Sequence, residues 1–120
     1  MGNPVVHFEI GGEDVERLTD FYSSAFEWEI TPLADQLYIA DPGSDKGIQG
    51  HLFQVTEETD STNKVIIYVE VDDIQACLSQ VENLGGQILI PPQEIPGNAS
   101  HFALFLDPSG NKIGLLQRRV

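Results

Sequence analysis

The sequence has 120 residues and a formal net charge of −13, with only six Lys and Arg side chains against 19 Asp and Glu. The length is that of a single domain, and so few cations argue against binding to nucleic acid or to an anionic membrane. The sequence shows no signal-peptide pattern of a basic region followed by an apolar stretch, and no apolar run approaches the length of a membrane span. The single cysteine, Cys77, excludes an internal disulfide. We therefore expect a cytoplasmic protein.

The first half of the chain predicts a strand, a helix and three further strands. Gly11 and Gly12 end the first strand, and from Asp14 onward apolar residues recur at three- and four-residue spacing, which indicates a helix with one apolar face. We expect Pro32 to interrupt the second strand, and residues 41–43 (DPG) to form a turn. The predicted strands are residues 4–10, 28–30, 37–40 and 47–55.

The second half predicts the same order of elements after a polar stretch at residues 57–63, where we place the boundary between two modules. An Asp at position 72 or 73 is expected to cap the helix, and Gly85-Gly86 to end it. We expect Pro91-Pro92 to end the strand that follows. The predicted strands are residues 65–71, 87–90, 101–106 and 112–117, and the helix carries Ile74, Cys77, Leu78, Val81 and Leu84 on its apolar face.

The two halves can be overlaid as copies of one unit. Residues 7–10 fall on 66–69, Asp14 on Asp73, and the Asp-Pro turn at 41–42 on that at 107–108. Matching glycine to glycine at the end of each half places residues 48–52 on 112–116. The shared order of elements predicts modules at residues 4–56 and 64–118 within one domain.

Four segments together resemble the vicinal oxygen chelate superfamily, which includes glyoxalase I, bleomycin and fosfomycin resistance proteins and extradiol dioxygenases. They are residues 6–10 (VHFEI), 20–28 (DFYSSAFEW), 84–86 (LGG) and 107–115 (DPSGNKIGL). The resemblance implies an α+β fold of two tandem βαβββ modules that form a half-open curved sheet with a cleft. It also implies a homodimer and a small-molecule ligand or substrate.

Metal-dependent members of this superfamily carry ligands on the first and last strand of each module. The overlay puts these positions on His7, Ile66, Gly50 and Gly114, and only the first of them offers a donor. His51 falls on Leu115 in this overlay and so on the other face, although a shift of one residue would turn it inward. Because a stable site usually has three protein ligands, the sequence predicts no metal cofactor, with His7 and His51 as the ligands if one binds.

The cleft candidates that share the face of His7 and its counterpart are His7, Glu9, Tyr68 and Glu70. His101, at the start of a later strand, is a further candidate at the cleft rim and could join His7 in a metal site. Because most of the family's ligand positions are empty, the resemblance implies a glyoxalase/bleomycin-resistance-like protein that binds a small molecule without the family metal, and the acidity of the chain would suit a cationic ligand. One alternative is a metal-dependent isomerase, lyase or dioxygenase that uses Zn, Ni, Mn or Fe. Another is a cofactor-free enzyme in which His7 and Glu9 act as acid and base.

Overall fold

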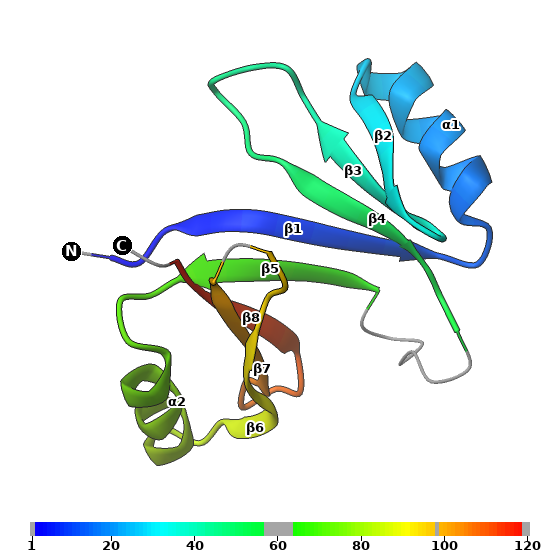
Figure 1. The fold of residues 1–120 in the computed structure, drawn as a ribbon. Helices are drawn as coiled ribbons and strands as arrows, with labels where there is room; N and C mark the ends of the chain where they lie inside the picture. Colours follow the sequence, from blue (N-terminus) through cyan, green and yellow to red (C-terminus); the bar gives the residue numbers. More distant parts are fainter. Residues whose placement is uncertain (1, 57–63, 98, 119–120) are drawn as a thin grey trace. The chain divides into compact units, whose positions relative to one another are not determined.

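The computed structural model describes residues 2–56, 64–97 and 99–118, and its chain divides into two compact units. One unit is residues 7–66, and the other is residues 1–6 together with 67–120 (Figure 1). The predicted module boundary at residues 57–63 lies outside the described residues, so the module bounds remain a prediction. No helix in the described part of the chain is long and apolar enough to cross a membrane.

The first unit has the order strand, helix and three strands. Its strands are arranged β2-β3-β4-β1, with β1 and β4 parallel and the other pairs antiparallel. The elements are β1 (Val5–Gly12), α1 (Val15–Phe26), β2 (Glu29–Ala34), β3 (Leu37–Asp41) and β4 (Gly50–Gln54).

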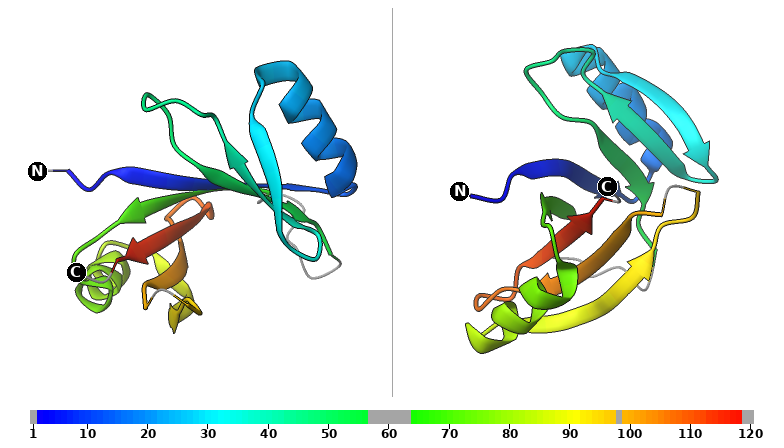
Figure 2. Two further views of the ribbon diagram at one scale, coloured as in Figure 1. Left: turned by 45° about the horizontal axis from the view of Figure 1, so that its top comes forward. Right: turned by 60° about the vertical axis from the view of Figure 1, so that its left-hand side comes forward.

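The second unit repeats this order, with strands arranged β5-β8-β7-β6 and the β5–β8 pair parallel. In each unit the helix covers one face of its own sheet (Figure 2). The predicted α+β fold with two βαβββ modules is confirmed. The elements are β5 (Val65–Glu70), α2 (Ile74–Asn83), β6 (Gln87–Glu94), β7 (His101–Leu106) and β8 (Lys112–Gln117).

Each helix packs on alternate residues of its sheet, and this packing fixes which way the strand side chains face. Val15 of α1 is buried with Ala40 and Leu52, and Ile10 packs against the same cluster. In the second unit α2 buries Ile74 and Leu78 against residues of β7 and β8. Because successive strand residues point to opposite faces, the residues between these core positions face away from the helices.

Proline does not end strands here as the sequence predicts. β2 continues through Pro32, and β6 continues through Pro91 and Pro92. Both strands lie at the end of their unit's strand order and pair on one side only, so the missing N–H of proline can face away from the ladder. The register of each shifts near its prolines, between Pro32 and Ala34 in β2 and between Ile88 and Gln93 in β6.

A glutamine at the end of each last strand binds the start of its unit's helix. The Gln54 side chain accepts a hydrogen bond from the Val15 amide at 3.0 Å, and the Gln117 side chain accepts one from the Ile74 amide at 2.7 Å. The first amides of a helix have no partner within the helix, so each glutamine satisfies a donor that would otherwise lack one.

These two bonds should contribute measurably to stability. We expect Gln54→Ala and Gln117→Ala each to lower the free energy of unfolding by about 1 kcal/mol in urea titrations, since each leaves a helix amide unpaired. Gln49→Ala is the matched control, because Gln49 is exposed and its bond to Asp41 is 3.4 Å long. If all three variants unfold at the same urea concentration as the parent, the two glutamines have no capping role.

Candidate functional site

The parallel pairing of β1 with β4 brings three polar side chains onto one face of the first unit. Glu9 lies opposite His51, and the next pair, Ile10 and Leu52, packs in the core beneath α1. Strand alternation therefore turns Glu9 and His51 to the face away from α1. His7 lies two residues before Glu9 and shares that face.

These three side chains are close enough to act together. His7 Nε2 and His51 Nδ1 are 2.6 Å apart and share a hydrogen bond, and the two ring centroids are 4.5 Å apart at an interplanar angle of 63°. A ring nitrogen of His7, a ring nitrogen of His51 and a carboxylate oxygen of Glu9 all lie within 4.8 Å of one another. All three residues are half-buried. They form a candidate metal site, which we call the His–His–Glu site.

Burial also sets the charge of one of these groups. Desolvation lowers the pKa of His51 below its ordinary value of 6.5, since a buried imidazolium loses favourable hydration. His51 is therefore mostly neutral at pH 7. The neutral imidazole has a lone pair that can bind a cation or accept a proton.

The donor set fits a divalent transition metal. Two imidazoles and one carboxylate hold catalytic zinc in some hydrolases and Fe(II) in oxygenases, with positions left open for water or substrate. Imidazole also suits Ni²⁺, whereas Mg²⁺ and Ca²⁺ prefer sites made only of oxygen donors. The residues of this site therefore match the metals used by the superfamily that the sequence resembles.

The overlay of the two last strands was wrong by one residue. Gln54 and Gln117 bind equivalent helix amides, and Leu52 and Leu115 occupy equivalent core positions, so His51 corresponds to Gly114 and not to Leu115. Gly50 faces α1, because a Cβ built on it would come within 2.5 Å of the Phe8 ring. The overlay matched Gly50 with Gly114, and it therefore placed His51 on the face toward the helix instead of the face of His7 and Glu9.

The second βαβββ module has no donors at the corresponding positions, Ile66 and Gly114. Ile66 is buried, with 5% of its surface exposed, and Gly114 lies beneath the Tyr68 ring, which would clash with any side chain there. Val69 packs on the α2 side, so Tyr68 and Glu70 face away from α2. The carboxylate of Glu70 forms an ion pair with Arg118 at 2.6 Å.

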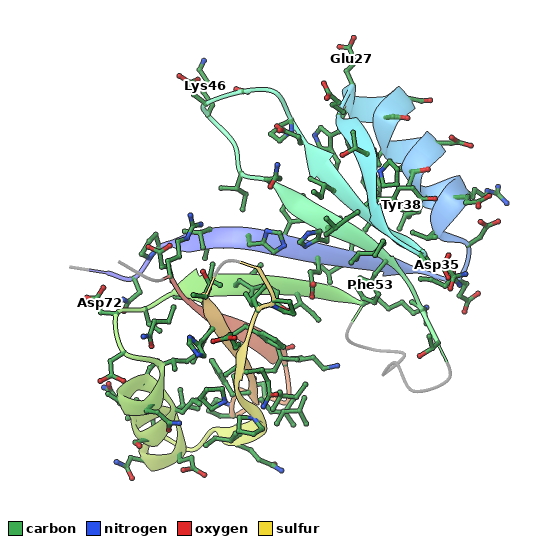
Figure 3. All side chains as sticks on the ribbon, viewed as in Figure 1. Glu27, Asp35, Tyr38, Lys46, Phe53 and Asp72 are labelled. Atoms are coloured by element: carbon green, nitrogen blue, oxygen red, sulfur yellow. The ribbon has the colours of Figure 1, made fainter. Side chains whose placement is uncertain are left out.

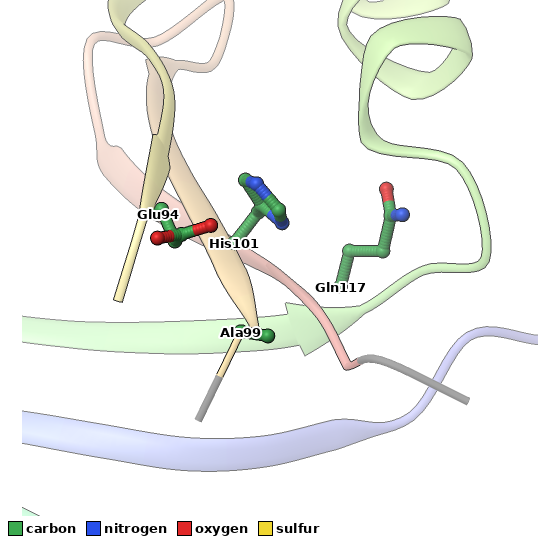
Figure 4. A pocket seen from close by; sticks show the side chains of 4 residues that line it. All are labelled: Glu94, Ala99, His101 and Gln117. Carbon is green, nitrogen blue, oxygen red and sulfur yellow. The ribbon is translucent and has the colours of Figure 1, made fainter. Parts of the chain in front are cut away.

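His101, which the sequence predicts near the rim of the cleft, lies on the α2 side of its sheet. It is the cross-strand partner of Gln117, whose side chain binds the first amide of α2, so both residues face the α2 side of their sheet. Tyr68 and Glu70 face the other way. His101 instead lines a half-open hollow of about 160 Å³ with Glu94, Ala99 and Gln117 (Figure 4).

The chain belongs to the Glyoxalase/Bleomycin resistance protein/Dioxygenase superfamily, which it matches over residues 5–115. A glyoxylase-like domain-containing protein of Didymella fabae is 29% identical over 117 residues, covering 92% of this chain and 90% of that protein. The anthracycline biosynthesis protein DnrV of Streptomyces peucetius is 23% identical over 94% of this chain, which spans about half (46%) of DnrV.

A solved structure agrees with these relatives in fold. The crystal structure of a superfamily member from Vibrio splendidus 12B01 matches with a TM-score of 0.71 at 15% sequence identity, over 97% of this chain and 99% of that one. This likeness places the two βαβββ modules in the glyoxalase fold.

Proposed function

We propose that this chain binds a divalent metal ion at His7, Glu9 and His51 and uses it to bind and activate a small oxygen-containing substrate. The observation that carries the proposal is the presence of three donor atoms within 4.8 Å of one another on one face of the first unit. A bound metal would act as a Lewis acid that polarises a substrate oxygen. This function is the metal-dependent alternative of the sequence analysis.

Each of the three side chains has its own role in this proposal. His7 and His51 share a hydrogen bond through ring nitrogens, and after loss of that proton these nitrogens would hold the cation. Glu9 offers negative charge beside both rings, which favours a cation. A carboxylate oxygen that is not bound to the cation can take up or return a proton of the substrate. These roles fit an isomerase, lyase or dioxygenase.

Metal content and thermal stability test this proposal. We expect the purified protein to hold up to one Zn, Ni, Mn or Fe per chain, and a metal added at 100 times its dissociation constant to stabilise the fold by about 2.7 kcal/mol. His7→Ala should remove both effects, because it leaves only two ligands. His101→Ala is the control, since His101 faces α2 and should leave both effects unchanged. A parent protein that takes up no metal and shows no thermal shift would contradict the proposal.

A metal-free binding protein is the second candidate, as the sequence predicts. The observation in its favour is the direct 2.6 Å hydrogen bond between His7 and His51, which pairs the two rings without a metal. In this case a small molecule, such as a cationic glycopeptide, would raise the melting temperature in the presence of a chelator. Neutral sugars of similar size should have no effect.

Two expectations from the sequence accompany this proposal. We infer a cytoplasmic location from the single cysteine, which fits a reducing compartment. We infer a homodimer from membership of the superfamily. Sedimentation at several protein concentrations would measure the second directly.

A further inference from the structure

Two pairs of residues in β1 and β4 have an aromatic ring that lies on a glycine of the neighbouring strand. Phe8 of β1 is the strand partner of Gly50, and Phe53 of β4 is the strand partner of Gly11. A Cβ built on either glycine would come within 2.5 Å of its partner's ring, so each ring fills the space above a glycine. We call these two pairs the ring–glycine pairs.

The ring–glycine pairs lie on either side of the donor pair of the His–His–Glu site. In the register of β1 on β4, the pair of Glu9 and His51 lies one position after Phe8 and two positions before Gly11. Phe8 faces α1, whereas Phe53, near the end of β4, lies on the face of the donors (Figure 3). The two rings therefore pack on opposite faces of the sheet.

The ring of Phe8 also contacts aromatic residues that join the sheet to the helix. Its centroid lies 5.6 Å from that of Trp28, and Trp28 stacks on Tyr22 of α1 at 5.0 Å with an interplanar angle of 9°. Tyr22 and Trp28 both pack against the core of the first unit. A slip of β1 along β4 would therefore disturb the packing of α1.

The ring–glycine pairs favour one register of β1 on β4. A slip of two residues would keep each side chain on its own face, so alternation alone does not exclude it. It would move His51 two positions away from Glu9, and it would place Phe8 opposite Leu52 or Ile48. Because β4 contains a single glycine, only the observed register places the Phe8 ring on a glycine of that strand.

We propose that Phe8 and Phe53 are positioning residues of the His–His–Glu site, which fix the register that places His51 opposite Glu9 and beside His7. Neither ring offers a metal ligand, so each acts through the pairing of β1 with β4. Donors held in place before the metal arrives bind it more tightly than donors that must be brought together. This inference rests on the proposed function for its metal, but the contact between His7 and His51 exists without one.

Zinc affinity tests the positioning role. We expect Phe8→Leu and Phe53→Ala each to weaken Zn²⁺ binding by about tenfold in competition with a chromophoric chelator, as is usual when groups that orient metal ligands are lost. Leu115→Ala is the control, since it opens a cavity in the core of the second unit and leaves β1 and β4 unchanged. It should bind zinc like the parent although it destabilises the chain.

An exchange of the ring and the glycine separates the register from the mere loss of a ring. Phe53→Gly should weaken zinc binding as Phe53→Ala does. Gly11→Phe combined with Phe53→Gly places a ring of β1 over a glycine of β4, and we expect it to bind zinc within about threefold of the parent. Gly11→Phe alone should weaken binding, because its side chain would clash with the Phe53 ring.

A measurement without metal reports the register directly. The ¹⁵N–¹⁵N coupling across the hydrogen bond between His7 Nε2 and His51 Nδ1 should be present in the metal-free parent and in Leu115→Ala. It should be lost when Phe8→Leu and Phe53→Ala are combined, because neither ring then holds β1 in place on β4.

The outcomes separate this inference from the proposed function. If zinc binds to the ring variants as it does to the parent, or weakens equally in Leu115→Ala, the inference is wrong and the metal site stands. If no zinc binds to the parent, the coupling between His7 and His51 decides the matter. Its loss in the combined variant alone upholds the positioning role, and a combined variant that keeps it, or a parent that lacks it, overturns that role.

Discussion

His51→Ala should lower the affinity of this protein for Zn²⁺ by at least about 100-fold, since it removes one of three donors and leaves the other two without a complete site. The expected effect depends on the face that His51 occupies. In the structure His51 lies 2.6 Å from His7 and opposite Glu9, whereas a strand shifted by one residue would put it in the core beneath α1. Competition with a chromophoric chelator at pH 7 measures the affinity.

Two further variants complete this comparison. Glu9→Gln keeps the size of the side chain and removes its charge, so it should weaken zinc binding less than His51→Ala does. His101→Ala changes a histidine that faces α2 in the other unit and should bind zinc like the parent. Equal losses in His101→Ala and His51→Ala would mean that the zinc binds to surface histidines without a defined site.

Leu52→Ala and Leu115→Ala should each lower the free energy of unfolding by about 2–5 kcal/mol, the usual cost of a cavity left by a buried leucine. Leu52 is fully buried and Leu115 is 2% exposed. They occupy equivalent positions, each two residues before the glutamine that binds its helix. For a chain of this length the melting temperature should fall by roughly 8–20 °C.

Leu33→Ala is the matched control for these two variants. Leu33 lies on β2 with 53% of its surface exposed, so its truncation should change the free energy of unfolding by less than about 0.5 kcal/mol. All measurements are made with a chelator present, so that metal binding does not add to stability. A loss in Leu33→Ala as large as in Leu52→Ala would show that burial does not distinguish these positions.

The order of elements could be predicted from the sequence because the period of the apolar residues changes clearly from strand to helix. The three- and four-residue spacing of apolar residues after Asp14 predicted α1 close to its observed bounds. The pair Gly85-Gly86 predicted the end of α2 within two residues of where it lies. The strands that contain prolines were predicted too short, because the effect of a proline depends on whether its strand lies at a sheet edge. That position is set by pairing between distant segments, which strand patterns do not reveal.

The donor cluster could be predicted only in part. His7 and Glu9 were placed on one face by alternation alone, which is a local property of β1. The face of His51 depended on aligning β4 with β8, where two glycines gave a false match. The sequence did contain a better signal, because a leucine two residues before a glutamine ends both strands, at Leu52 and Gln54 and at Leu115 and Gln117.

All three donors of the proposed site come from β1 and β4 of one unit. The corresponding positions of the second module, Ile66 and Gly114, offer none. Metal binding should therefore follow the fold of residues 7–66.

The most direct test of the His–His–Glu site is a long-range ¹H–¹⁵N spectrum of the histidine side chains during titration with Zn²⁺. The chain has three histidines, so each ring can be assigned with one variant. We expect the ring nitrogens of His7 and His51 to shift together and to stop shifting at one zinc per chain, while those of His101 stay unchanged. Spectra in which His7 and His51 do not respond to zinc, or in which all three rings shift gradually without reaching a plateau, would contradict a metal site at His7, Glu9 and His51.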